Sequence, residues 1–83
     1  MIVVAVIKAR EGKEKEVESI LKGLVEPTHR EPGCVLYALH RSMEDLQTFV
    51  FVEKWKSEQD LNKHLQSSHI EQGFAKEAEL MEV

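Results

Sequence analysis

Residues 48–56 read TFVFVEKWK, and this stretch decides the fold. Its aromatic residues Phe49, Phe51 and Trp55 alternate with valines, which predicts a β-strand whose two faces are both apolar. Glu53 falls on the aromatic face. Because neither face of such a strand is suited to water, the sheet that contains it must be covered on both sides.

A second strand is expected to precede this one. Residues 34–41, CVLYALHR, are rich in strand-forming side chains, and the polar loop over residues 42–47 joins them to the following stretch as a hairpin. Val35, Tyr37 and Leu39 are expected on one face of this strand, opposite its other apolar residues.

A strand and a helix are expected before the hairpin. Residues 2–9, IVVAVIKA, are rich in β-branched side chains and predict the first strand of the chain. After Gly12, the sequence KEKEVESILKGLVE predicts an amphipathic helix with glutamates near its start. Pro27 disfavours helix at Glu26, so we expect the helix to end or kink there. The apolar residues at helical spacing are Val17, Ile20, Leu21 and Leu24.

Two more helices are expected after the hairpin. Ser57 is a candidate N-cap with Asp60 three residues on, so a short helix should run from about residue 58 to 66. From Ser68 onward, apolar residues recur every three or four positions, which fits another helix in spite of Gly73. The recurring residues are Ile70, Phe74, Ala78 and Met81.

The element order β-α-β-β-α is that of the ferredoxin-like split βαβ sandwich, an α+β fold. A right-handed crossover then places the first strand beside the third, with the helices on one sheet face. The chain is expected to form a single domain over residues 1–83. Its second sheet face stays apolar, so we expect two copies to pack face to face as a homodimer. A fourth strand normally lies beside the first, and the residues after Met81 are too few to supply it.

Charge and composition exclude several classes of function. The formal net charge is -4, from 11 basic and 15 acidic residues spread along the chain, so no basic stripe is available to bind nucleic acid. No run approaches the ~18–20 apolar residues of a membrane helix. The opening MIVVAVI lacks the flanks of a signal peptide, so we expect a cytoplasmic protein with no membrane partner. Cys34, the one cysteine, is expected to be buried and inert.

A set of short motifs extends over about residues 2–76 at characteristic separations. It consists of EPGC at Glu31–Cys34, Tyr37, LHR at Leu39–Arg41, FVFVEKW at Phe49–Trp55, Ser57, Leu61, His64 and His69. Taken together, these motifs resemble the antibiotic biosynthesis monooxygenase family, in particular its small quinol-monooxygenase-like members.

The resemblance implies a dimeric α+β barrel with a pocket in each subunit between the sheet and its helices. Members oxygenate electron-rich aromatic molecules such as quinols and anthrones without a metal, haem or flavin, and only some members have this activity. We therefore expect a monooxygenase that needs no cofactor and whose partner is a small aromatic molecule. Members usually end in a further strand that packs on the partner subunit, and that strand is expected to be missing here.

Two residues are candidates for catalysis. Glu53 lies on the aromatic strand face, where burial disfavours a charged carboxylate and suits it as a proton acceptor or an orienting group. A structural carboxylate bound to a helix terminus or to a histidine is the alternative. His64 follows Leu61 on the helix face that meets the sheet, where a neutral imidazole can take a phenolic proton. The alternative is a buried histidine with a structural role only.

Three aromatic residues are candidates for stacking on a planar substrate, although such residues are more often simple core: Tyr37, Phe51 and Trp55. His40 is a further substrate-binding candidate. The strand alternation places it opposite Tyr37, so an anchoring role or a dimer contact competes with that assignment. His69 follows His64 by five residues, which is not the spacing of two metal ligands on one helix, so no metal site is predicted. We expect His69 to cap or pack the last helix.

Other functions fit the same residues. Isomerases of small phosphorylated signals, of the autoinducer-degrading type, share the fold and the Glu, His, His pattern, but the basic residues here are dispersed and form no phosphate cradle. Related haem monooxygenases use an asparagine on the first strand, and residues 1–9 contain none. A non-catalytic small-molecule-binding or stress-response protein is a further alternative, since a fold does not fix a function.

Overall fold

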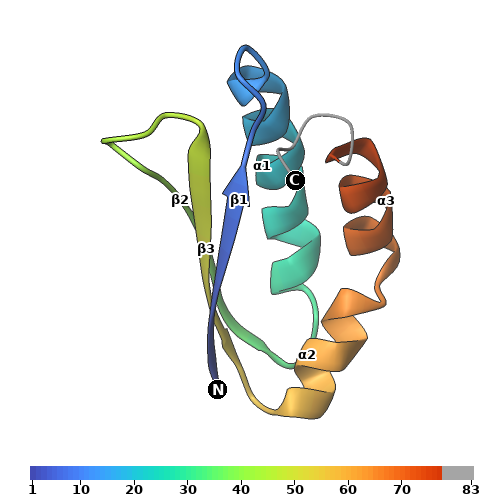
Figure 1. The fold of residues 1–83 in the computed structure, drawn as a ribbon. Helices are drawn as coiled ribbons and strands as arrows, with labels where there is room; N and C mark the ends of the chain where they lie inside the picture. The colour runs from blue at the N-terminus through green and yellow to red at the C-terminus, as the bar shows by residue number, and fades with distance from the viewer. Residues whose placement is uncertain (78–83) are drawn as a thin grey trace.

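The computed structural model describes residues 1–77, in which three strands form one antiparallel sheet and three helices lie on one side of it (Figure 1). The elements are β1 (Ile2–Lys8), α1 (Glu14–His29), β2 (Cys34–Arg41), β3 (Thr48–Trp55), α2 (Glu58–Leu65) and α3 (Ser68–Glu77). The strand order is β1-β3-β2, so β3 is the central strand. The α+β ferredoxin-like fold and the pairing of the first strand with the third are confirmed.

The predictions for the end of the chain stay predictions. Ala78 and Met81, and with them the expectation about a fourth strand, lie outside the described residues.

The hydrophobic core lies between the sheet and the helices. On β3 the alternating residues Phe49, Phe51 and Trp55 are almost fully buried, as the sequence pattern predicted. Across from them, α1 buries an apolar stripe and α3 contributes Ile70. Burial of large aromatic side chains is the main source of stability in a domain of this size.

An end or a kink of α1 was expected at Pro27, and the first of these is wrong. The helix does not stop at Pro27 but continues to His29. Pro27 lies in the last turn, where the missing N–H removes only one helical hydrogen bond. The turn then closes because the N–H of Arg30 donates to the carbonyl of Pro27 at 3.2 Å.

The predicted faces of β2 also need a correction near its start. A β-bulge lies between Cys34 and Leu36, so Val35 is the extra residue and does not share the buried face of Tyr37. Val35 is 53% exposed, whereas Tyr37 is buried. From Tyr37 onward, the alternation is as expected.

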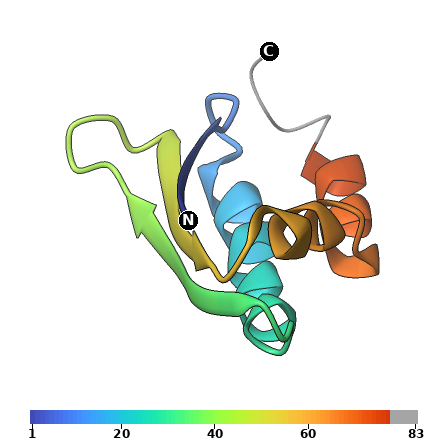
Figure 2. The same ribbon diagram turned by 90° about the horizontal axis from the view of Figure 1, so that it is seen from below.

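The outer sheet face carries no helix in the described part of the chain (Figure 2). Its edge strand β1 presents Ile2, Val4 and Val6, which are 72%, 62% and 67% exposed. Leu36 on β2 adds to the same face, and the loop between β2 and β3 carries Met43, which is 95% exposed. This is a continuous apolar surface of the kind that a soluble protein normally covers.

None of the helices in residues 1–77 has the length and apolar character needed to cross a membrane.

The turn after α1 is docked tightly onto the start of α2. Ser57 caps α2, accepting a hydrogen bond from the backbone N–H of Asp60 at 3.2 Å and donating its own hydroxyl to Asp60 Oδ2 at 2.8 Å. Gly33 is buried directly against this cap, and a Cβ atom built on it would lie 2.2 Å from both Cβ and Cγ of Asp60. Only glycine fits here, because the neighbouring side chain occupies the space that a Cβ needs.

We expect Gly33→Ala to lower the free energy of unfolding by about 2–3 kcal/mol, because the added methyl group forces the turn away from α2. Urea denaturation followed by circular dichroism measures this loss. Gly23→Ala is the matched control, since no atom lies within 4 Å of the position that its new Cβ would take and a helical alanine should gain up to ~1 kcal/mol. A Gly33→Ala protein as stable as the wild type would contradict this packing.

Candidate active site

A cavity of about 360 Å³ lies between the sheet and α2 and α3. Its walls are mostly apolar, and the polar side chains among them are those of Glu53, His64 and Tyr37. Leu65 and Phe74 also line the cavity and are both more than a third exposed, so they mark its mouth. A largely apolar cavity with a few polar groups, within the range of about 300–1,000 Å³, is typical of a small-molecule site.

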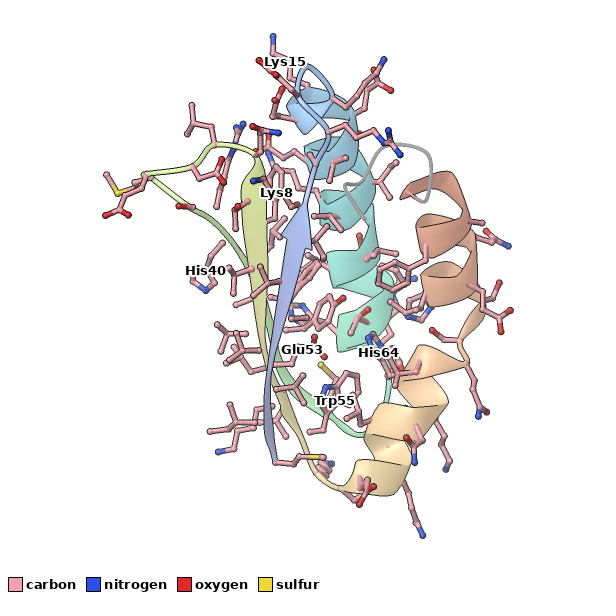
Figure 3. The ribbon with its side chains drawn as sticks, in the orientation of Figure 1. Lys8, Lys15, His40, Glu53, Trp55 and His64 are labelled. Carbon is pink, nitrogen blue, oxygen red and sulfur yellow. The ribbon has the colours of Figure 1, made fainter. Side chains whose placement is uncertain are left out.

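His64 is the buried imidazole of this cavity. It lies near the end of α2, points toward the sheet and is 2% exposed (Figure 3). Its ring lies 4.5 Å from the ring of Trp55 and 5.3 Å, edge-on, from the ring of Tyr37. These contacts fix the ring plane, so the imidazole is presented to the cavity in one orientation.

Glu31 sets the hydrogen-bonding state of His64. Its Oε2 lies 2.7 Å from Nδ1 of His64. A carboxylate oxygen can only accept, so Nδ1 carries the proton and donates it to Glu31. In the neutral ring the other nitrogen, Nε2, then holds a lone pair and is a proton acceptor.

The EPGC turn places Glu31 beside α2. The N–H of Glu31 donates to the carbonyl of Thr28 at the end of α1, and its own carbonyl accepts from the N–H of Cys34, both at 3.0 Å. The Gly33 carbonyl is held by the N–H of Lys56 at 2.9 Å. Glu31 was part of the sequence motif, but no role was predicted for it. Its position directly before a Pro-Gly turn was the one feature of the sequence that could have indicated a role.

Glu53 is 4% exposed and lies on the helical side of the sheet (Figure 3). It lines the cavity together with Phe51. Its Oε1 accepts a hydrogen bond from the indole N–H of Trp55 at 2.9 Å. This contact follows from the strand period, because residues two apart on β3 share a face. The partner is therefore neither a helix terminus nor a histidine, the two structural partners considered from the sequence.

His69 converges on the same carboxylate as His64. Its Nε2 lies 2.9 Å from Glu31 Oε2, and the two imidazole ring centres are 6.1 Å apart. On one continuous helix, residues five apart are turned by roughly 140°. Here α2 ends at Leu65 and α3 starts at Ser68, so the chain turns between the two histidines. The spacing rule for one helix therefore does not apply to this pair, and the expectation of no metal site stays a prediction.

The aromatic candidates occupy the cavity wall or support it. Tyr37 and Phe51 line the cavity, and their rings stack at 4.4 Å. Trp55 does not line the cavity, but it holds both Glu53 and His64.

The assignment of His40 to the substrate site has to be corrected. His40 lies on the outer face of the sheet, is exposed, and points away from the helices (Figure 3). The alternation of β2 separates it from Tyr37, so it does not line the cavity.

Cys34 lies half-buried at the start of β2. Burial is the main cause that raises the pKa of its thiol, and the nearby carboxylates of Glu31 and Glu53 raise it further. The thiolate is therefore scarcer at a given pH than in a free cysteine. Cys34 is half-buried and not buried as expected, and the inertness of its thiol stays a prediction.

A sheet covered by helices on one side defines a domain of the ferredoxin-like class, and its layers enclose an apolar cavity with a carboxylate-held histidine. The sequence profile of the family described as antibiotic biosynthesis monooxygenase matches residues 1–76. The chain belongs to this family.

Individual relatives agree with this membership. YcnE of Bacillus subtilis, named as a candidate monooxygenase, is 32% identical over 81 residues, which cover 98% of this chain and 85% of that protein. An uncharacterized protein of Synechocystis is 26% identical over 98% of this chain, which spans about half (55%) of that protein's length. The crystal structure of PA3566 from Pseudomonas aeruginosa matches with a TM-score of 0.94 at 28% identity. The match covers 99% of this chain and 83% of the PA3566 chain. The family and the name of YcnE support a monooxygenase-like function in general terms.

We expect the Cys34 thiol to react with Ellman's reagent at about pH 8 more slowly than a small peptide thiol, because its raised pKa lowers the thiolate fraction. The same protein unfolded in urea should react at the peptide rate, which provides the control. Equal rates for the folded protein and the peptide would show that the thiol is neither shielded nor depleted of thiolate.

Proposed function

We propose that this protein oxygenates a quinol-like or polycyclic aromatic molecule in the cavity, with His64 as the base and without a redox cofactor. The observation that carries the proposal is the contact between Glu31 Oε2 and His64 Nδ1 at 2.7 Å. It makes Nε2 the proton-accepting nitrogen of a ring that lines an apolar cavity.

The cavity suits a planar, weakly polar ligand. The stacked rings of Tyr37 and Phe51 offer an aromatic wall against which a flat substrate can lie. Glu53 can accept a hydrogen bond from a substrate hydroxyl and so orient the ring toward His64. Family membership and a relative named as a candidate monooxygenase support the reaction class.

The reaction needs no external reductant. Proton transfer to His64 converts the phenol into an electron-rich anion, which passes one electron to dioxygen and leaves a substrate radical and superoxide. Their recombination forms a carbon–oxygen bond, and loss of water from the resulting peroxide leaves one oxygen atom on the substrate. A hydroquinone plus dioxygen thus gives a hydroxyquinone plus water, with all electrons supplied by the substrate. The low polarity of the cavity protects the intermediates from solvent.

We expect His64→Ala to lower kcat by about 10²–10⁴-fold, since it removes the base, and Glu53→Gln to lower it by a smaller factor. Oxygen uptake with a panel of hydroquinones and anthrones measures the rate, and ¹⁸O₂ should place one labelled oxygen in the product. Glu71→Gln, an exposed change on α3, is the control for the glutamate substitution.

Three results would count against these assignments in different ways. Wild-type rates in both His64→Ala and Glu53→Gln would remove the residue roles but leave the reaction. A wild-type protein that consumes no oxygen with any substrate of the panel would remove the monooxygenase proposal. Conversion of a substrate without oxygen uptake would favour the isomerase alternative.

We further propose that two copies pack through the outer sheet face to form a homodimer. The exposed valine and isoleucine side chains of β1, together with Leu36, form an apolar patch, and a two-fold axis through it would bury the patch of one copy against that of the other. The loop carrying Met43 projects away from the helices and beyond the sheet, where it can reach a second copy (Figure 1). Most of the residues that line the cavity lie on the helical side of the sheet, and Val6 on the edge strand β1 belongs to both the patch and the cavity lining.

We expect Val4→Lys to convert the dimer into a monomer, because Val4 is already 62% exposed in one chain and a lysine there costs the fold little. Sedimentation equilibrium at micromolar concentration measures the mass. Gln59→Lys adds the same charge on the exposed side of α2 and should leave the dimer intact. A wild-type protein that sediments as a monomer would contradict the proposed dimer.

A further inference from the structure

The side chains of Glu31, His64 and His69 bring together three groups that bind metals. One ligand atom from each, Glu31 Oε2, His64 Nδ1 and His69 Nε2, lies within 4.8 Å of the other two. They come from three separate segments: the turn after α1, the end of α2 and the start of α3. We propose that these three residues form a binding site for one divalent transition-metal ion, with Zn²⁺ as the type case. We call this set the Glu-His-His cluster.

The chemistry of the Glu-His-His cluster selects the class of ion. Two imidazole nitrogens and one carboxylate oxygen form a ligand set that suits Zn²⁺ and its neighbours in the first transition row. Mg²⁺ and Ca²⁺ prefer oxygen ligands throughout, so they are disfavoured. With neutral imidazoles the cluster carries one negative charge, which a divalent ion reverses to one positive charge.

The present distances are those of hydrogen bonds, 2.7 Å and 2.9 Å from Glu31 Oε2 to the two nitrogens. Tetrahedral coordination with bonds of about 2.1 Å separates neighbouring ligand atoms by about 3.4 Å, so each of the two oxygen–nitrogen pairs has to open by roughly 0.5 Å or more. His64 is held by Trp55, with 3% of its side chain exposed. Glu31 and His69 are 17% and 22% exposed, so these two side chains have room to make the adjustment.

Binding requires no net loss of protons from neutral rings. In each ring, the nitrogen that binds the metal loses its proton: Nδ1 in His64 and Nε2 in His69. The other nitrogen of the same ring then takes up a proton from solvent. Both rings therefore change tautomer while keeping their charge. Both rings already direct the nitrogen that would bind the metal toward Glu31 Oε2.

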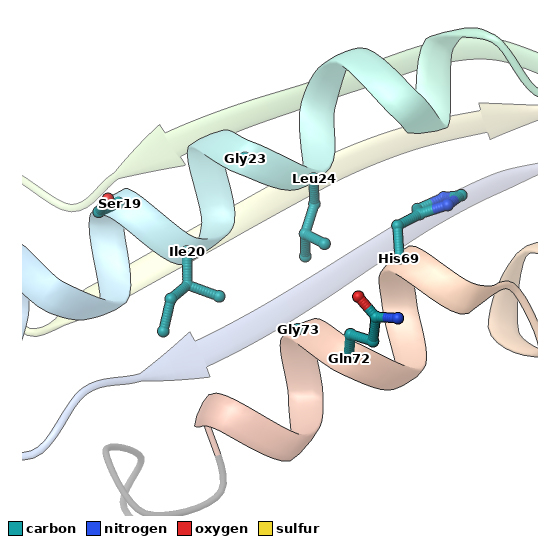
Figure 4. A pocket seen from close by; sticks show the side chains of 7 residues that line it. All are labelled: Ser19, Ile20, Gly23, Leu24, His69, Gln72 and Gly73. Atoms are coloured by element: carbon teal, nitrogen blue, oxygen red, sulfur yellow. The ribbon is translucent and has the colours of Figure 1, made fainter.

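An open groove gives the ion a route to the cluster. This groove, of about 340 Å³, runs between α1 and α3, and His69 lines it together with Ser19, Gln72 and Gly73 (Figure 4). Water in the groove can complete the coordination sphere, since the protein supplies only three ligands. Ser67 Oγ lies 3.2 Å from His69 Nε2 and donates to the carbonyl of His64, so it supports the position of both histidines.

A bound ion would act against the proposed reaction. Coordination at Nδ1 of His64 places its proton on Nε2, and that nitrogen then cannot accept a proton from a substrate. The metal site nevertheless rests on the three side chains alone and not on the proposed activity, so binding can be tested without any substrate.

The test is a titration of the untagged, chelator-treated full chain with Zn²⁺ followed by calorimetry, and with Co²⁺ followed by its visible absorption. We expect one ion per chain, a dissociation constant of about 10 µM or lower, and the intense Co²⁺ bands of a tetrahedral nitrogen and oxygen site. His69→Ala and Glu31→Gln should weaken binding by at least tenfold. His40→Ala, which removes an exposed histidine from the far side of the sheet, should leave it unchanged.

Circular dichroism of each variant checks that a loss of binding is not a loss of the fold, and Glu31→Gln keeps the size of the original side chain. No saturable binding by the wild-type chain up to about 100 µM Zn²⁺ would overturn the proposal and leave the cluster as a hydrogen-bond network. Binding that persists in His69→Ala and disappears in His40→Ala would equally overturn it, by moving the site to the other face. These outcomes are independent of whether oxygen is consumed in the activity assay.

Discussion

The carboxylate of Glu31, shared between two imidazoles, is the interaction on which the rest of this structure depends. A partly buried carboxylate is costly unless donors surround it, and here His64 at 2.7 Å and His69 at 2.9 Å both donate to one oxygen. The three side chains tie the turn after α1 to α2 and α3. The contact that joins these segments also determines which nitrogen of His64 can accept a proton. One hydrogen-bond network therefore contributes both to stability and to the proposed reactivity.

The alternation of side chains on the central strand β3 gives the sheet an inner face toward the helices and an outer apolar face. Because side chains alternate on β3, the aromatic set with Glu53 faces the helices and the valines face outward. The inner side encloses the cavity, while the outer side keeps an apolar surface. One periodic pattern therefore accounts for both a sheltered ligand site and a face available to a second copy.

Local patterns in the sequence predicted most of the fold. The alternation on residues 48–55 and the cap formed by Ser57 were confirmed because each depends on neighbours within a few residues. The path through Pro27 was not predicted, since the preference against helix is weak in a last turn. The bulge at Val35 was missed for a different reason. The register of β2 is set by its pairing with β3 and not by the local sequence.

The candidate site was predicted only in part. His64, Glu53, Tyr37 and Phe51 line one cavity, as their positions on helix and strand faces indicated. The role of Glu31 and the approach of His69 depend on contacts 33 and 38 residues apart in the chain. No spacing rule for a single helix can find them, because the turn between α2 and α3 brings the two histidines together.

The most direct test of this account is the protonation state of the His64 ring in the free protein. Long-range ¹H–¹⁵N correlation spectra at about pH 8, where an ordinary imidazole is neutral, distinguish the two tautomers. If Glu31 accepts a hydrogen bond from His64, the wild-type ring carries its proton on Nδ1. In Glu31→Ala the ring should change to the other tautomer, with the proton on Nε2. A wild-type ring that carries its proton on Nε2 would contradict it, because Nδ1 would then have no hydrogen to donate.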